Sequence, residues 1–302
     1  MSIAFLLPPI MPVSPVDREL SMQHIVDYLD SVLVEDGGSL GRGSFELHNP
    51  IDDLGSMAFY LTYYGVNLRP VREKLAAVAL KGHPGLRFEA AHCASRSDDV
   101  NRRLEIGIVS KSLFDHSTGK WILGMIRELD RSKFHVTVVM IPPLHDDYIA
   151  SAVRAAADKV VIPTAELDGI RTTIADLLLD ILVLADIGMD STLYAVSFAR
   201  LAPVQVGIAA AWPVTTGVPT VDYMASFDVV SSSFHLCILA QKPGVGTSLT
   251  LAVFHNLCVR SGNRSRAGSL QRNSHSLAWD TSILTPRRTS ASREFERSAL
   301  EP

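Results

Sequence analysis

The sequence predicts an α/β protein built around a Rossmann-like parallel sheet. Two observations lead to this class. From about residue 101 to residue 232, short apolar runs alternate with segments of helical period, which is typical of parallel strands joined by helices. The chain is also 47% apolar over 302 residues, enough to bury a sizeable core. We expect a mainly helical lead-in over residues 1–100, the sheet over 101–232 and an irregular tail over 233–302.

The lead-in segment contains two predicted helices. The first spans Val16 to Val34, where apolar residues recur near helical spacing until two glycines end the pattern. The second begins near Arg69 and ends at the Gly-His-Pro sequence of residues 82–84. Between them lies the aromatic segment Phe59 to Tyr64, which we assign to the core rather than to a ligand platform.

The sheet region is predicted as an alternating series. The expected strands are Leu104–Ser110, Phe134–Ile141, Lys159–Ile162, Ile181–Ala185 and Val204–Ala209. The expected helices are Gly119–Leu129, Ile149–Ala157, Leu167–Leu179 and Ser191–Arg200. In such a fold, ligands bind at the carboxyl ends of the strands.

Charge and cysteine content exclude several functional classes. The formal net charge of −4 is small for this length, so neither a nucleic-acid partner nor a polyanion mimic is expected. Cys93, Cys237 and Cys258 are odd in number and widely spaced, which argues against a disulfide framework and a cysteine zinc site. The ten histidines include no pair at metal-ligand spacing backed by a third ligand. We therefore expect no metal and a reducing, cytoplasmic location.

No membrane segment is expected. The apolar N-terminus, residues 3–13, has no basic region and is interrupted by prolines. The longest later uncharged run, residues 243–259, contains glycines, a histidine and an asparagine, and is shorter than the roughly 20 apolar residues that a spanning helix needs.

The first candidate site follows the first strand of the sheet. His116 lies where that strand joins the next helix, and an imidazole there could accept a proton from an attacking hydroxyl. Thr118 and Gly119, at the start of the helix, offer backbone N–H groups to an anion. Asp115 is an alternative helix cap. A polar surface loop without function is the competing interpretation.

Two further loops follow strands. In the loop Pro213-Val-Thr-Thr-Gly217, Thr215 and Thr216 can donate hydrogen bonds, and Gly217 permits a backbone geometry that brings N–H groups toward a phosphate or sugar. A turn stabilised by its own side chains explains the same residues equally well. The acidic loop Asp186–Asp190 follows a buried strand, and there we favour Asp190 as the cap of the next helix.

Several segments resemble the catalytic region of the protein O-linked N-acetylglucosamine transferases, in particular the bacterial SPINDLY-like family. The resemblance covers roughly Phe45 to Ser226. It is carried by Phe198-Ala-Arg-Leu-Ala-Pro-Val-Gln205, by Trp212-Pro-Val-Thr-Thr-Gly-Val-Pro-Thr-Val-Asp-Tyr223, and by Arg103-Leu-Glu-Ile-Gly-Ile-Val-Ser110 with His116.

The resemblance implies the first lobe of a two-lobed GT-B glycosyltransferase. The implied reaction is metal-independent, inverting transfer of N-acetylglucosamine from UDP-N-acetylglucosamine to Ser or Thr hydroxyls of an acceptor protein. It implies that His116 lies beside the reacting centre, and that Pro213, Thr215 and Thr216 face the donor sugar and diphosphate. No cofactor is implied beyond the donor substrate.

The sequence departs from the family after this lobe. The family's Trp-Gly-His-Pro is replaced by Ala209-Ala-Ala-Trp-Pro213, and the residues after Tyr223 are fewer than the roughly 100 that a second Rossmann lobe needs. The Ser- and Arg-rich stretch from Arg260 to Pro302 is predicted to be disordered. We therefore expect a truncated or frame-shifted product, and a catalytically silent binding or remnant domain is the alternative function. An exposed lobe face would favour self-association.

Overall fold

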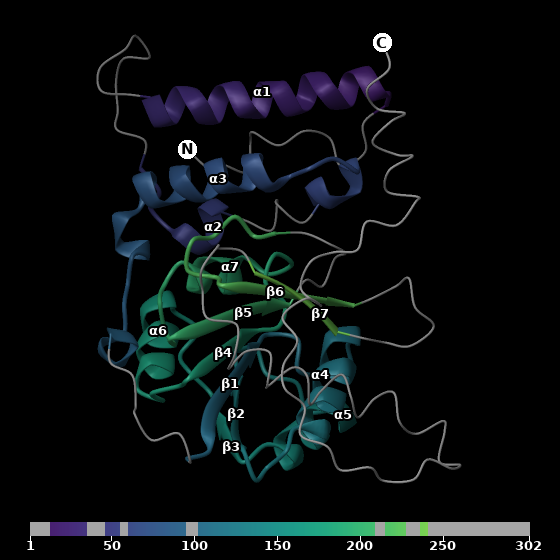
Figure 1. Cartoon of the computed structure of the whole chain (residues 1–302), viewed down its shortest axis with the longest axis vertical. Coiled ribbons are helices and arrows are strands. Elements are labelled where there is room, and N and C mark those ends of the chain that lie inside the picture. The colour runs from purple at the N-terminus through teal and green to yellow at the C-terminus, as the bar shows by residue number, and fades with distance from the viewer. Residues whose placement is uncertain are drawn as a thin grey trace, which may run out of the picture. The chain divides into compact units, whose positions relative to one another are not determined.

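The computed structural model describes residues 13–34, 46–54, 60–94, 102–208, 215–227 and 236–240, all within one compact unit, residues 1–265 (Figure 1). The strands are β1 Leu104–Ser110, β2 Phe134–Met140, β3 Lys159–Val161, β4 Ile181–Leu184, β5 Val204–Ile208, β6 Tyr223–Phe227 and β7 Leu236–Ala240. They form one sheet in the order β3-β2-β1-β4-β5-β6-β7. Neighbouring strands from β3 to β6 are parallel, and β7 is antiparallel to β6. The predicted Rossmann-like α/β class is confirmed, because the six parallel strands have the order of the doubly wound fold.

The described helices correspond to the predicted ones, except that α2 was not expected and α6 ends at Ala175 rather than at Leu179. They are α1 Pro15–Val34, α2 Pro50–Leu54, α3 Arg69–Gly82, α4 Ser117–Glu128, α5 Tyr148–Ala156, α6 Leu167–Ala175 and α7 Ser191–Ser197. Short 3₁₀ helices cover Tyr60–Tyr64, Pro84–Leu86 and Ala91–Ala94. The last two sheet strands, β6 and β7, are additional to the predicted series. Strand β7 lies within the segment 233–302 that was expected to be irregular, and the rest of that segment lies outside the described residues.

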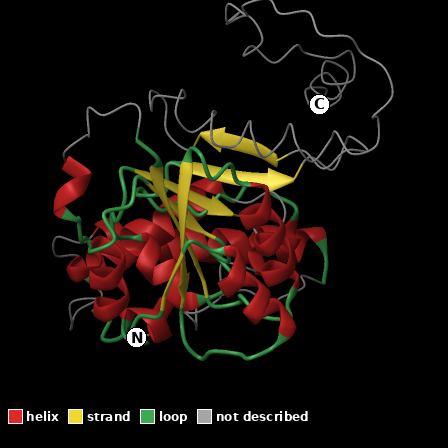
Figure 2. Ribbon diagram, turned by 90° about the horizontal axis from the view of Figure 1, so that it is seen from below, coloured by secondary structure: helices red, strands yellow, loops and turns green. Residues whose placement is uncertain are grey.

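The sheet separates two hydrophobic cores, and helices cover both of its faces (Figure 2). Alternate residues of one strand face opposite sides, so Ile108 of β1 packs into one core and Val109 into the other. The Ile108 side holds the buried residues of α4 and α5. The Val109 side holds those of α6 and α7, together with buried residues of α1 and α3. Strands buried on both faces explain the continuous Val, Ile and Leu runs in the sequence.

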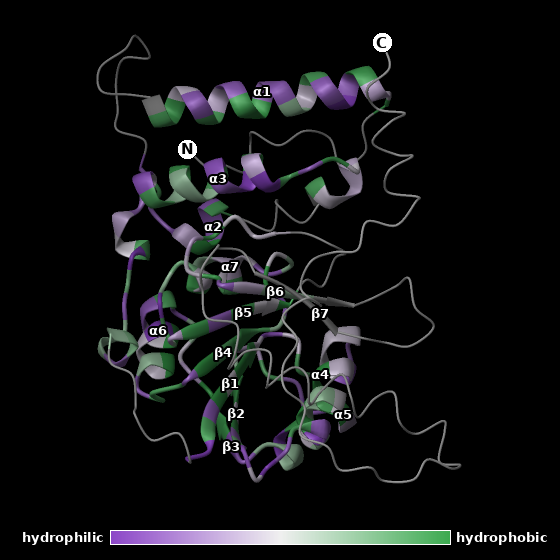
Figure 3. Cartoon of the chain, in the orientation of Figure 1, coloured by the Kyte–Doolittle hydropathy of each residue, from purple (hydrophilic) through white to green (hydrophobic). Residues whose placement is uncertain are grey.

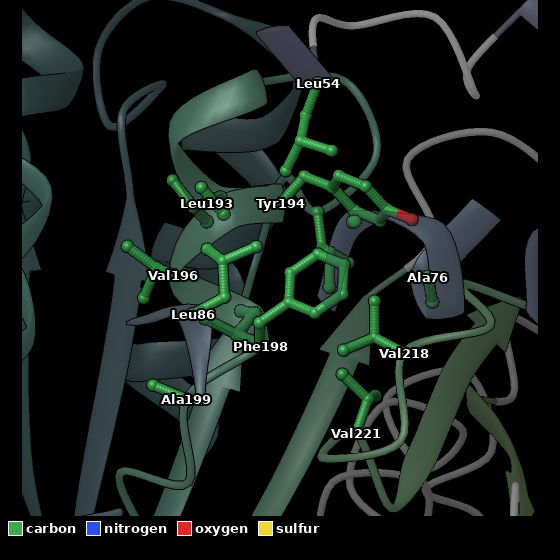
Figure 4. Packing of buried hydrophobic residues seen from close by; sticks show 14 of the residues in the cluster. Leu54, Ala76, Leu86, Leu193, Tyr194, Val196, Phe198, Ala199, Val218 and Val221 are labelled. Carbon is green, nitrogen blue, oxygen red and sulfur yellow. The ribbon is translucent and has the colours of Figure 1, made fainter. Parts of the chain in front are cut away.

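The core on the α7 side joins residues from both ends of the described chain. Tyr194 and Phe198 meet edge to face with ring centroids 5.3 Å apart. Figure 4 shows Leu54, Ala76 and Val218 around these two rings. Residues from before and after position 101 therefore share one core.

Helix α1 packs against α3 and is held by polar contacts as well as apolar ones. Ile25 and Leu29 of α1 are buried, and Figure 3 shows hydrophilic and hydrophobic bands alternating along the helix. Lys74 of α3 forms an ion pair with Asp30. The Lys81 ammonium donates to the carbonyl of Val32 at 2.7 Å. No helix in the described ranges is both long enough and apolar enough to cross a membrane.

A buried ion pair fixes the loops on both sides of β5. Arg200 and Asp222 are joined by two N···O contacts of 2.5 and 3.0 Å. The Asp222 carboxylate also accepts from the backbone N–H of Gln205, and the Gln205 side-chain amide donates to the carbonyls of Ala199 and Thr220. Both the loop entering β5 and the loop entering β6 are thereby tied to the same strand.

Candidate functional site

The strand order identifies one edge of the sheet as the place for a site. After β1 the chain crosses to β2 and β3 on one side, whereas β4, β5 and β6 lie on the other side of β1. The loops after β1 and β4 therefore lead in opposite directions from adjacent strands. In open parallel sheets this switch point, at the carboxyl ends of the strands, is where ligands bind.

Asp186 lies at this switch point, directly after β4, and its side chain is fully buried. Its Oδ2 atom accepts hydrogen bonds from the Ser110 hydroxyl at 3.0 Å and from the Lys111 N–H at 3.2 Å. These two bonds join the carboxyl ends of β1 and β4. Its other oxygen, Oδ1, has no hydrogen-bond partner among the residues that the structure describes.

Burial raises the pKa of Asp186 to about 6. The nearby hydroxyls of Ser112 and Ser110 and the Lys111 N–H lower the pKa, whereas the Asp190 charge raises it. The Ser112 hydroxyl thus favours the charged form, although no hydrogen bond of normal geometry reaches Oδ1. A carboxyl group with this pKa can change its charge near neutral pH.

Asp190 is the cap of α7, as the sequence predicted. Its Oδ1 atom accepts the N–H of Leu193 at 3.1 Å. Its Oδ2 atom lies 3.2 Å from the Lys111 ammonium, which also contacts the Thr192 hydroxyl at 3.5 Å. The cap and the ion pair therefore hold the loops after β1 and β4 together a second time.

His116 is positioned as the N-cap of α4. Its Nδ1 atom accepts the backbone N–H of Thr118 at 3.2 Å, and the ring is half-buried. The alternative prediction, that Asp115 caps this helix, is wrong. The Asp115 carboxylate pairs with Lys120 at 2.6 Å instead, and both side chains are exposed. A neutral imidazole that accepts at Nδ1 carries its proton on Nε2. In this geometry the Nε2–H group of His116 can donate a hydrogen bond, and the predicted role of His116 as a base stays a prediction.

Gly119 and Thr118 serve the packing of α4 in this structure. A Cβ atom on Gly119 would lie 2.1 Å from the carbonyl oxygen of Phe114, so the helix start packs directly against the preceding loop. Thr118 is buried, and its N–H is the group that His116 caps. Their predicted anion-binding role stays a prediction.

The threonine loop forms two turns stabilised by its own hydroxyls. Thr215 Oγ1 accepts the N–H of Gly217 at 3.3 Å, and Thr216 Oγ1 accepts the N–H of Val218 at 3.2 Å. Thr216 is buried and Thr215 is half-buried. Gly217 has a φ of +70°, a conformation that favours glycine. Pro213 lies outside the described residues.

A third loop, after β2, reaches the same edge and was not anticipated from the sequence. The His145 ring stacks on Phe114, with centroids 3.9 Å apart. Asp147 caps α5 through the N–H of Ala150 at 2.9 Å and also accepts the N–H of Asp115 at 2.8 Å. These two backbone hydrogen bonds lower the pKa of Asp147, and the bond from Ala150 has the larger effect. The only sequence signal was an Asp in front of a helical period.

The described side chains include no group of three or more His, Cys, Asp or Glu residues that could hold a metal ion. The residues that the structure brings together at the switch point are Ser110, Lys111, Ser112, Asp186 and Asp190. His116 stands at the helix start that follows the same β1 loop. This polar group can donate to, and accept from, a ligand that carries both hydroxyl and anionic groups.

Comparisons with known proteins give matches among solved structures only. No protein-family model matches the chain, and no curated protein matches it. Among solved structures, the chain is similar to a mutant of the Thermobaculum terrenum O-GlcNAc transferase, with 22% sequence identity and a TM-score of 0.46. The match covers 69% of this chain and 36% of that one, so the chain spans about a third of its length. At this level the likeness does not establish a family for the chain.

Proposed function

We propose that this chain is a glycosyltransferase lobe that binds a nucleotide sugar at the carboxyl edge between β1 and β4. The donor we propose is UDP-N-acetylglucosamine, and the acceptor is a Ser or Thr hydroxyl of a protein. The observation that carries the proposal is the convergence of Lys111, Asp186 and the His116-capped start of α4 at the switch point of a doubly wound sheet. The resemblance of residues 103–110 and 198–223 to O-GlcNAc transferases supplies the sugar and the acceptor.

The proposed reaction is a single displacement. The acceptor hydroxyl oxygen forms a bond to the anomeric carbon while the bond between that carbon and the diphosphate oxygen breaks. UDP leaves with the bonding electron pair, the configuration inverts, and the acceptor proton passes to a base. Because His116 accepts at Nδ1, its Nε2–H group is suited to orient an oxygen of the acceptor or the diphosphate.

The second candidate is a binding domain without transferase activity. The described residues form a single sheet, and the hydroxyls of Thr215 and Thr216 are engaged within their own loop. A leaving diphosphate needs preorganised donors or cations around it, which one lobe supplies only in part. In either case we propose a nucleotide sugar and a protein as the partners, and the cytoplasm as the location. We also propose self-association through the exposed face of the lobe.

Calorimetric titration with UDP and UDP-N-acetylglucosamine tests donor binding. We expect micromolar affinity for the wild type and a weaker affinity for the double variant Thr215→Ala, Thr216→Ala if that loop faces the donor. His116→Asn is the informative second variant, since asparagine keeps the helix cap and removes the imidazole. The absence of heat up to millimolar nucleotide would contradict the proposal.

Transfer itself is tested separately from binding. The wild type is incubated with UDP-N-acetylglucosamine and a Ser-containing peptide, and the mass of one added N-acetylhexosamine is sought by mass spectrometry. Donor binding together with an added sugar supports the transferase. Donor binding without transfer favours the silent binding domain.

A further inference from the structure

The Asp186 carboxyl has one oxygen that the fold uses and one that it does not. Oδ2 accepts the Ser110 hydroxyl and the Lys111 N–H, and these bonds tie β4 to β1. Oδ1 is buried and has no hydrogen-bond partner among the described residues. An unsatisfied buried acceptor is destabilising. A side chain whose only role was to link β4 to β1 would therefore not require this second oxygen.

An asparagine would serve the structural tie equally well. Its single carbonyl oxygen could accept both bonds that Oδ2 accepts, and no charge would be buried. The carboxylate differs from asparagine in what it offers at the Oδ1 position, where asparagine would place an NH₂ donor. Aspartate and asparagine therefore differ in their effect on a group that contacts the Oδ1 position.

The residues that lie against the Asp186 carboxyl are less buried than Asp186 itself. Lys111 and Ser112, which lie against the Asp186 carboxyl, are both half-buried. Among the described residues, the charged groups next to Asp186 are Lys111 from the β1 loop and Asp190 from the β4 loop. Since the Lys111 ammonium pairs with Asp190 at 3.2 Å, no ion pair is formed between Lys111 and Asp186. A ligand group that approaches Oδ1 thus meets an acceptor without a bound cation.

Resting on the function proposed above, we infer that Asp186 Oδ1 recognises a ring hydroxyl of the ligand, which donates its hydrogen to the carboxylate. Two parts of a nucleotide sugar carry such hydroxyls, the hexose and the ribose. A site built to bond a hydroxyl discriminates strongly against ligands that lack it, because the buried oxygen is otherwise left unsatisfied. Asp186 would then be a determinant of specificity.

Ionisation gives this inference a distinct signature. Oδ2 accepts two hydrogen bonds, so a proton on Asp186 would occupy Oδ1 and turn the acceptor into a donor. The affinity for a hydroxyl donor should therefore rise as the pH rises through about 6, where the group loses its proton. Between pH 5 and pH 7.5 the expected increase is about tenfold. Each phosphate of a sugar nucleotide carries one ester bond and one anhydride bond. The probe itself therefore has no phosphate group that titrates between pH 5 and pH 7.5.

The test measures the dissociation constant of UDP-N-acetylglucosamine at pH 5, 6 and 7.5 for the wild type and Asp186→Asn. We expect the variant to bind roughly tenfold or more weakly at pH 7.5 and to lose the pH dependence. Asp190→Asn is the matched control, because it removes a carboxylate from the same loop and keeps the helix cap. Its pH dependence should remain, with the midpoint at a lower pH, because the Asp190 charge raises the pKa of Asp186. His116→Asn shows whether the imidazole contributes to the pH profile.

The outcomes separate this inference from the proposed function. Wild-type binding that is independent of pH and unchanged in Asp186→Asn would overturn the role of Asp186 and leave the proposed function standing. If the nucleotide sugar does not bind at all, saturation-transfer NMR with N-acetylglucosamine and with uridine tests the hydroxyl site alone. Binding of one probe that is lost in Asp186→Asn would support the site and identify the ring. Absence of both would overturn both proposals.

Discussion

Gly217 lies so close to Arg72 that a Cβ atom at position 217 would be 2.3 Å from the Arg72 carbonyl carbon. The loop before β6 is thereby seated on the backbone of α3. Gly217 meets this requirement in two ways, by its missing side chain and by its φ of +70°. The glycine that the sequence offered as a phosphate or sugar contact is thus also required by packing.

Replacing Gly217 by Ala should destabilise the protein by more than backbone strain alone. The matched control is Gly65→Ala, since Gly65 has a φ of +65° but no atom within 4 Å of its Cβ position. The control should lose about 1–2 kcal/mol in free energy of unfolding from the left-handed conformation. Gly217→Ala should lose clearly more in a urea denaturation series. Equal losses would show that α3 yields to the new methyl group.

Helix α4 contains its own matched pair of glycines. Gly119→Ala would place a methyl group 2.1 Å from the Phe114 carbonyl oxygen, whereas the Cβ of Gly124→Ala meets nothing within 4 Å. We expect Gly119→Ala to lower the melting temperature and Gly124→Ala to raise the free energy of unfolding by roughly 0.5–1 kcal/mol. Differential scanning calorimetry of both variants checks this. A stabilised Gly119→Ala would contradict the close contact with the loop.

Asp186 should make the stability depend on pH. Its pKa is about 6 in the folded state against an ordinary 3.8, so the folded state binds the proton more tightly than the unfolded state does. Its contribution is therefore greatest at low pH and is lost as the pH rises through about 6. Relative to Asp186→Asn, the wild type should lose about 1–1.5 kcal/mol between pH 5 and pH 7.5.

Denaturant titrations of these two proteins at both pH values measure that difference. Asp190→Asn, compared with the wild type in the same way, serves as the reference. A difference between wild type and Asp186→Asn that stays constant with pH would show that the carboxyl keeps an ordinary pKa when folded.

The ion pair of Arg200 and Asp222 should contribute far more than the surface pair of Lys120 and Asp115. Asp222→Asn leaves a mostly buried guanidinium without its counter-charge and should cost about 3 kcal/mol in free energy of unfolding. Asp115→Asn removes an exposed partner and should cost less than about 0.5 kcal/mol. Urea denaturation of both variants gives the comparison. Losses of similar size would mean that burial does not distinguish the two pairs.

The cap role of His116 predicts a graded series. His116→Ala removes the acceptor for the Thr118 N–H and should destabilise the protein by about 1 kcal/mol, whereas His116→Asn should retain most of that stability. The two melting temperatures distinguish the cap from any ligand role, which both variants lose. Equal stability of the two variants would argue against the cap.

Much of the fold could be predicted from the sequence because its strands are continuous apolar runs. Ile181–Leu184 and Phe134–Met140 are buried on both faces, so their composition alone indicates a covered parallel sheet. The five-residue α2 was not predicted, since it is too short for a period to show. Strand β6 was not predicted either, because its apolar run directly follows a loop that contains glycine and proline.

The candidate site was predictable only in part. His116 and Asp190 could be placed because each follows a strand and precedes a helix, which is a local pattern. The unsatisfied Asp186 oxygen and the seat of Gly217 on Arg72 depend on residues far apart in the sequence. Such contacts arise from the tertiary arrangement and leave no periodic trace in the chain.

Helix α3 connects distant parts of the described chain mechanically. Lys74 of α3 forms an ion pair with Asp30 of α1, and two residues earlier the α3 backbone at Arg72 packs against Gly217. Loss of the contact between α1 and α3 should therefore also loosen the loop before β6, because α3 makes both contacts within one helical turn. Amide hydrogen exchange in α1 and at residues 215–218 should accelerate together when Lys74 loses its charge, as expected of segments that open as one cooperative unit.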